Sequence, residues 1–185
     1  EGCKLMIAAG DWPQPRSIGQ FVPRELRPHI IGSISAEGPE ELASDSGFNP
    51  GELIIDGLLV QGKLSVTAGS IRIHLSHSTL VPAFGGIKVE KDSTVELTVD
   101  RSICGPIEIA ALFSSIILNE SIVDAEENNK AISAENSTAR IDRCTILGAS
   151  RLRRLEASNS IFTEEVTVKQ RQEGCVRFSY LPHDS

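Results

Sequence analysis

The chain has 185 residues, 40% of them hydrophobic, and a net charge of −7, which fits one folded domain with a continuous core. The negative charge argues against nucleic acid as a partner, because phosphate binding needs a clustered excess of Lys and Arg. The sequence holds no secretory signal pattern and no apolar run near the ~20 residues of a membrane-spanning helix. We therefore expect a soluble protein without membrane insertion.

The beginning of the chain repeats weakly and holds six of the nine prolines. Two short apolar pieces, residues 4–7 and 29–34, are predicted to be early strands. Residues 10–28 and 36–52 are predicted to be long excursions or a cap, which would cover an open sheet edge. The chain begins at Glu1 without a methionine, and we expect it to be a piece of a longer protein.

From residue 55 onward, one short phrase recurs along the chain. Two of its copies are VDRSICG at 99–105 and IDRCTILG at 141–148. We align the copies on their first aliphatic residue, which we call the anchor, and find six anchors: Ile55, Leu75, Val99, Leu118, Ile141 and Ala157. The anchors are 20, 24, 19, 23 and 16 residues apart, a spacing typical of a solenoid with loops of variable length.

Strands rather than helices are predicted within each repeat. Apolar residues alternate with polar ones before most anchors, as in Ile71, Ile73 and Leu75. β-Branched residues dominate, and no stretch of the repeat sustains the spacing of an amphipathic helix. Strands this short cannot pair within one coil, so their backbone groups must bond to the coils above and below.

These patterns predict an all-β fold, a single-stranded parallel β-helix (solenoid) with irregular N-terminal excursions. The rule for parallel crossovers predicts that the helix is right-handed. We divide the chain into an N-terminal cap with early coils and long loops, residues 1–52, and the β-helix coils, residues 53–185. Both parts belong to one continuous domain.

Three phrases, VDRSICG, LNESIVDA and IDRCTILG, resemble coils of the right-handed parallel β-helix superfamily, the pectate-lyase-like fold. The resemblance covers roughly residues 50–180 and implies the fold, but no activity, because this fold hosts lyases, hydrolases and structural rods. Residues 154–182 are also similar to the end of bacterial β-helix proteins that accompany phage-tail-like contractile injection systems. That similarity implies a protein of the bacterial cytoplasm or of a secreted particle.

Residues at the same offset from the anchor should stack in columns along the rod. The column four residues past the anchor is rich in aliphatic and β-branched side chains and faces outward if the alternation holds. An apolar strip on the surface of a rod should be covered, either by an excursion of this chain, by a second copy or by a partner protein. We predict a binding surface there, made of Thr79, Ile103, Ile122, Thr145 and Ile161.

The best catalytic candidates are Asp100 and Asp142 in one column and Arg101 and Arg143 in the next. In an enzyme acting on polysaccharide, such groups would supply the acid, the base and a cation on an outer face. The intervening coil inserts Asn and Glu, so the columns read Asp-Asn-Asp and Arg-Glu-Arg. This alternation favours a ladder of turn caps and neutralising charges over a catalytic site, and we assign no catalytic residue.

Metal and cofactor motifs are absent from the sequence. The four cysteines form no CxxC pair, and His74 and His77 would need a third ligand from a neighbouring coil, so we expect no metal and no cofactor. Cys104 and Cys144 fall in different columns two coils apart, about 9.6 Å along the axis. A disulfide between them is excluded on that spacing.

Basic side chains are unevenly distributed along the chain. Residues 140–185 hold 8 basic and 6 acidic side chains, against 10 and 19 in residues 1–139. A local basic patch around Arg151, Arg153 and Arg154 is one interpretation, and a solvated edge is the simpler one that we favour.

The sequence as a whole predicts a non-enzymatic, rigid rod that serves as a structural or binding element, with a protein partner or self-association along the apolar strip. Two alternatives stay open: an enzyme acting on polysaccharide, and a carbohydrate-binding module. The module is disfavoured by the scarcity of aromatic residues, which are six Phe, one Trp and one Tyr.

Overall fold

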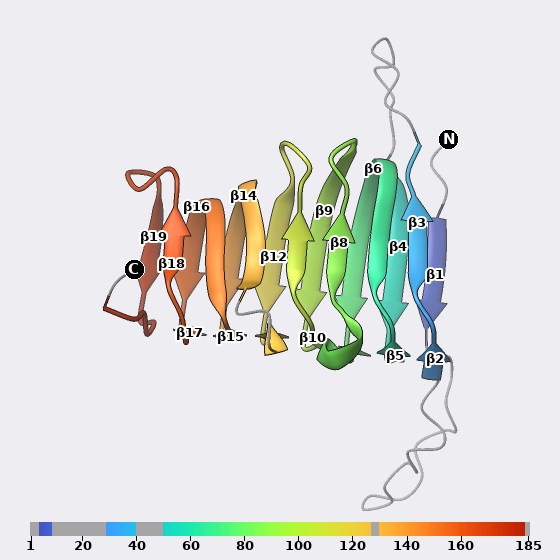
Figure 1. Cartoon of the computed structure of the whole chain (residues 1–185), viewed down its shortest axis with the longest axis horizontal. Helices are drawn as coiled ribbons and strands as arrows, with labels where there is room; N and C mark the ends of the chain where they lie inside the picture. Colours follow the sequence, from blue (N-terminus) through green and yellow to red (C-terminus); the bar gives the residue numbers. More distant parts are fainter. Residues whose placement is uncertain (1–3, 9–28, 40–49, 127–129, 184–185) are drawn as a thin grey trace, which may run out of the picture.

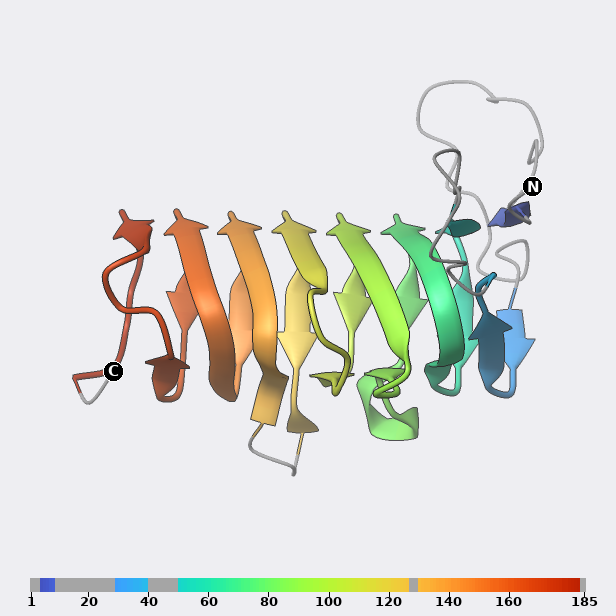
Figure 2. The same cartoon turned by 90° about the horizontal axis from the view of Figure 1, so that it is seen from above.

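The computed structural model describes residues 4–8, 29–39, 50–126 and 130–183. Its strands stack side by side into a rod, with the chain winding from one end to the other (Figures 1 and 2). All pairings between the named strands are parallel and join strands of neighbouring windings, or coils. The structure is therefore a parallel β-helix, which confirms the predicted all-β fold.

Each coil contributes strands to three faces. The anchor face consists of β1 (Lys4–Ala8), β4 (Gly51–Asp56), β9 (Ser93–Asp100), β12 (Ser115–Asn119), β19 (Gly174–Arg177) and the second halves of β6 (Leu64–Ser76), β14 (Lys130–Asp142) and β16 (Ala149–Ser158). The short-strand face is the seven-stranded sheet of β2 (His29–Ile31), β5 (Leu59–Gln61), β7 (Thr79–Leu80), β10 (Ile103–Cys104), β13 (Ile122–Asp124), β15 (Thr145–Leu147) and β17 (Ile161–Phe162). The third face consists of β3 (Ile34–Glu37), β8 (Ile87–Val89), β11 (Ile107–Ile109), β18 (Val166–Val168) and the first halves of β6, β14 and β16.

The predicted anchor column is confirmed coil by coil. In the strand register, each anchor pairs with the next one along the rod: Ile55 with Leu75, Leu75 with Val99, Val99 with Leu118, Leu118 with Ile141, and Ile141 with Ala157. Each anchor side chain is at most 4% exposed. The aliphatic residues therefore form a continuous file inside the rod, and the alternation between them sets which side chains face outward.

The apolar pieces at the beginning of the chain also form coils. β1 and β2 pair with β4 and β5, and β3 pairs with β6. The stretch 36–52, predicted to be an excursion, begins and ends in strands, since β3 runs to Glu37 and β4 begins at Gly51. Both strands form because Ala36 packs against the core and Leu53 lies in it. Residues 40–49 of that stretch, and the predicted excursion 10–28, lie outside the described residues.

The chain bends between the anchor face and the short-strand face two residues after each anchor. The residue at this position has a φ between 45° and 70° in every coil from Gly57 onward: Gly57, His77, Arg101, Glu120, Arg143, Asn159 and Phe178. A left-handed backbone costs a residue with a Cβ roughly 1–2 kcal/mol. The bend must therefore be held by other interactions.

A ladder of serine hydroxyl groups, buried in all but the last described coil, holds the bend. Ser102 Oγ accepts a hydrogen bond from the backbone N–H of Ser78 at 3.1 Å and donates one to the carbonyl of Asp100 at 2.8 Å. The same pair of bonds, one to the neighbouring coil and one within the coil, recurs at Ser78, Ser121, Ser160 and Ser179. Each hydroxyl thus accepts a hydrogen bond from a backbone N–H that has no partner in the β-sheet at the bend.

We expect Ser102→Ala to lower the free energy of unfolding by about 1–3 kcal/mol, because it leaves the buried N–H of Ser78 without a partner. Urea unfolding measures the effect. The matched control is Ser65→Ala, since the half-buried Ser65 hydroxyl makes no hydrogen bond within the described residues. Equal stability of the two variants would show that the hydroxyl ladder does not hold the bend.

Candidate functional site

The five residues predicted to form a binding surface stand in one column on the short-strand face. The register pairs Thr79 with Ile103, Ile103 with Ile122, Ile122 with Thr145, and Thr145 with Ile161. All five face outward: Ile103, Ile122 and Ile161 are 39%, 38% and 50% exposed, and the two threonines are half-buried. We call this column the apolar strip.

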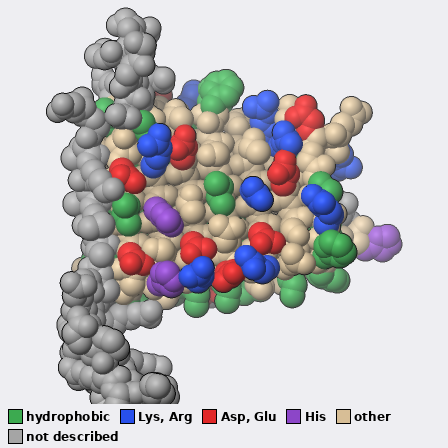
Figure 3. All heavy atoms as spheres, turned by 180° about the vertical axis from the view of Figure 1, so that it is seen from behind, with side chains coloured by type: hydrophobic (Ala, Val, Ile, Leu, Met, Phe, Trp, Pro, Cys, Tyr) green, Lys and Arg blue, Asp and Glu red, His purple; other side chains and the backbone are tan. Residues whose placement is uncertain are grey.

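The apolar strip extends at both ends and lies along one edge of the rod. Leu59 precedes it in the register, and Tyr180, 61% exposed, bridges to Ile161. Figure 3 shows hydrophobic side chains gathered along the lower edge of the rod, the edge on which the short strands lie in Figure 1, next to a row of charged and histidine side chains. The surface is therefore apolar along the strip and polar beside it.

The row of charges beside the apolar strip is an interconnected ladder on the bend. Arg101 Nε lies 3.2 Å from Glu120 Oε2, and Arg143 Nη2 lies 3.1 Å from Glu120 Oε1. Arg101 Nη1 lies 3.3 Å from His77 Nε2, whose Nδ1 lies 3.2 Å from Asp56 Oδ1. We call these five residues the charged ladder. Exposed pairs of this kind add little stability, but Arg101, Glu120 and Arg143 give an alternating order of charges beside the strip.

The four catalytic candidates are members of this network or contact it. Asp100 and Asp142 share a column, separated by Asn119, as the repeat alignment predicted. Asp142 Oδ2 lies 3.1 Å from Arg143 Nε, and Asp100 Oδ2 lies 3.8 Å from Arg101 Nε. Each aspartate thus pairs with the next residue of its own coil, and each arginine pairs with Glu120 of the coil between them. A catalytic role for the four residues stays an untested prediction.

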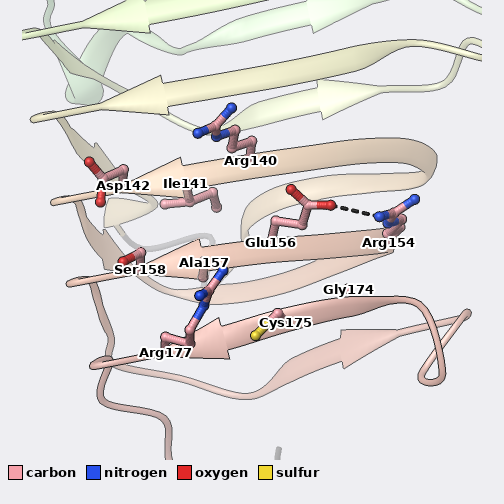
Figure 4. Close-up of a pocket in the computed structure, with 10 residues that line it drawn as sticks. All are labelled: Arg140, Ile141, Asp142, Arg154, Glu156, Ala157, Ser158, Gly174, Cys175 and Arg177. Carbon is pink, nitrogen blue, oxygen red and sulfur yellow. Dashed lines mark hydrogen bonds and ion pairs between the residues drawn. The ribbon is translucent and has the colours of Figure 1, made fainter.

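A groove on the anchor face was not predicted from the sequence. It has a volume of about 580 Å³, crosses β14, β16 and β19, and is drawn in Figure 4. Its lining includes three arginines, Arg140, Arg154 and Arg177, of which the sequence interpretation had weighed only Arg154. The one signal for it was the excess of basic residues after position 140.

The carboxylates in this groove already have partners. Glu156 Oε1 lies 2.6 Å from Arg154 Nη2, as Figure 4 shows, and Asp142 is held by Arg143 outside the groove. A further carboxylate, Glu173, lies 3.9 Å from Arg154. Within the described residues, the side chains of Arg140 and Arg177 form neither an ion pair nor a hydrogen bond.

The cysteines of the described residues are all free thiols. Cys104 and Cys144 are buried, and burial raises the pKa of the Cys104 thiol to about 12 and that of the Cys144 thiol to about 11. Both are therefore unreactive at neutral pH. Cys175, by contrast, is exposed on β19 and lines the groove.

The fold places the protein in a structural class, the parallel β-helices, but this class has no common activity. No protein-family model matches the chain, and neither the curated proteins nor the solved structures contain a match. In the part of the chain that the structure describes, no helix is long and apolar enough to cross a membrane. The same residues contain no group of three potential metal ligands close enough to share an ion.

Proposed function

We propose that this protein is a rigid, non-catalytic β-solenoid that serves as a structural element and binds a protein partner along the apolar strip. The observation that carries the proposal is the outward column of Ile103, Ile122, Thr145 and Ile161 on one parallel sheet. Exposed apolar residues are ordinary when scattered singly, whereas a contiguous row on one face is typical of an interaction site.

The interior of the rod supports a structural role. The file of anchors, the hydroxyl ladder at the bend and the charged ladder outside it repeat with the coils, about 4.8 Å apart. Each coil is thereby tied to its neighbours by backbone, core and surface interactions. Such a solenoid holds surface side chains at fixed positions, which suits a scaffold for a long, narrow interface.

The surroundings of the apolar strip support a protein as the partner. The strip presents aliphatic side chains and one tyrosine, residue types that pack in the centre of protein interfaces, and the charged ladder lies beside it as a polar rim. Alternating charge along that rim would select a partner with the opposite order of charges. We extend the proposal to a larger bacterial assembly of the phage-tail-like kind, supported by the similarity of residues 154–182.

We expect Ile122→Asp to reduce complex formation by about tenfold or more, equivalent to about 1.4 kcal/mol, because it buries an unpaired carboxylate in an apolar contact. Ile117→Asp is the matched control, since Ile117 is also 38% exposed but faces outward from β12 on the anchor face. A photo-crosslinking amino acid at position 122 or 117 of the full-length protein, followed by mass spectrometry, measures the contact in cells.

A defined adduct with another protein, formed from position 122 only and lost when a neighbouring strip residue is changed by Ile103→Asp, supports the proposal. An adduct with a second copy of the chain, together with a dimer in sedimentation equilibrium, would show that the apolar strip mediates self-association instead of binding a different protein. If positions 122 and 117 give the same adducts or none, the apolar strip is ordinary surface and the proposal fails.

A further inference from the structure

We propose that the groove on the anchor face binds a small anionic molecule that carries at least two carboxylate or phosphate groups, through Arg140 and Arg177. The groove lies on a different face of the rod from the apolar strip. The inference therefore does not depend on the proposed protein partner.

The strand register builds the groove from two columns. Arg140, Glu156 and Cys175 follow one another in the first column, and Asp142, Ser158 and Arg177 in the second. In Figure 4, Arg177 rises from β19 and reaches β16 beside Ala157, while Arg140 stands on β14 with its guanidinium group on the side away from β16. The two guanidinium groups thus stand on either side of β16, whose backbone, Ser158 and ion-paired Glu156 and Arg154 line the groove between them.

The charges in the groove leave these two arginines uncompensated. Asp142 is paired with Arg143, and Glu156 is paired with Arg154. Arg140 and Arg177 have no side-chain partner within the described residues. In a protein with a net charge of −7, two unpaired arginines that line one groove create a local positive potential that attracts anions.

The donors in the groove match oxyanions. The planar guanidinium group binds carboxylate and phosphate oxygens with two parallel hydrogen bonds. Ser158 adds a hydroxyl that accepts a hydrogen bond from Asn159 Nδ2 at 2.9 Å and donates to none of the described residues, so its proton is available to a ligand. The volume of about 580 Å³ lies within the range of small-molecule sites.

The thiol of Cys175 serves as a built-in reporter for the groove, because it lines the groove while Cys104 and Cys144 are buried. The experiment uses the full chain with Cys3→Ser and measures the rate at which the neutral reagent iodoacetamide alkylates Cys175. Citrate and pyrophosphate are the probes, one for each class of oxyanion, and sodium chloride at equal ionic strength is the reference.

We expect citrate or pyrophosphate to slow alkylation in a saturable way that sodium chloride does not reproduce. The one that binds more tightly identifies the carboxylate or the phosphate class. Combining Arg140→Gln and Arg177→Gln should weaken this protection by about tenfold or more, whereas Arg151→Gln, at an exposed arginine outside the groove, should leave it unchanged. Circular dichroism checks that the variants fold.

Protection that fails to saturate, or that is the same in the double variant and in Arg151→Gln, would overturn the anion site. The strip variant Ile122→Asp separates the two proposals. It should weaken partner binding by about tenfold or more and leave citrate or pyrophosphate protection intact, so either proposal can fail while the other stands.

Discussion

Leu118→Ala should lower the free energy of unfolding by about 2–5 kcal/mol, the range for truncating a fully buried leucine. Leu118 lies in the middle of the anchor file, directly between Val99 and Ile141, and is 0% exposed. Neighbouring backbones are fixed by the parallel ladders on both sides, so the coils cannot collapse into the cavity. We therefore expect a cost in the upper half of that range, measured by urea or thermal unfolding.

The control for this prediction is the adjacent residue of the same strand. Ile117 faces outward, so Ile117→Ala should cost less than about 1 kcal/mol even though it removes a side chain of similar size. If the two variants lose equal stability, the assignment of inward and outward columns is wrong. Every inference about the apolar strip would then fail with it.

The columns could be predicted from the sequence because strand alternation has a period of two. A shift of one residue exchanges the inner and outer faces, so one correct alignment on the anchors fixes the column of every aligned residue. The pairing of Val99 with Leu118 and that of Ile103 with Ile122 follow from the same alignment. Variable loop lengths do not change the column assignment, because the loops lie between the aligned phrases.

The backbone conformation of the bend could not be predicted in the same way. Arg and Glu seldom adopt a left-handed backbone, yet Arg101 and Glu120 both have a positive φ, as His77 does. The buried hydroxyl that follows, and the ion pairs made by the side chains themselves, hold them there. Tertiary contacts thus override a local preference, which a sequence pattern does not reveal.

The groove was missed because charge pairing depends on side-chain direction as well as on columns. The register places Arg140 directly beside Glu156, which would suggest an ion pair between coils. In the structure, Glu156 instead pairs with Arg154, two residues away on the same face of the same strand. Arg140 is thereby left unpaired, a consequence that the sequence alone does not give.

Gly105→Ala should cost about 3 kcal/mol, somewhat less than the core truncation and for the opposite reason. Gly105 is buried where the chain leaves the short-strand face, and an added Cβ would collide with the backbone carbonyl oxygen of Gly85 in the neighbouring coil. The two coils are hydrogen-bonded next to this contact, because the Ile87 N–H donates to the Pro106 carbonyl at 2.8 Å. Since the colliding atom belongs to the backbone, the clash can be relieved only by moving the two coils apart.

Unfolding measurements on Gly105→Ala test this close approach, with Glu108→Ala as the control. The control places the same methyl group at an exposed position of β11 and should change stability by no more than about 0.5 kcal/mol. A tolerated Gly105→Ala would mean that the coils near β8 and β11 can separate without loss. A large cost, together with that of Leu118→Ala, would show that the coils resist both a cavity between them and an added atom. That is the rigidity required of a scaffold that presents the apolar strip at fixed spacing.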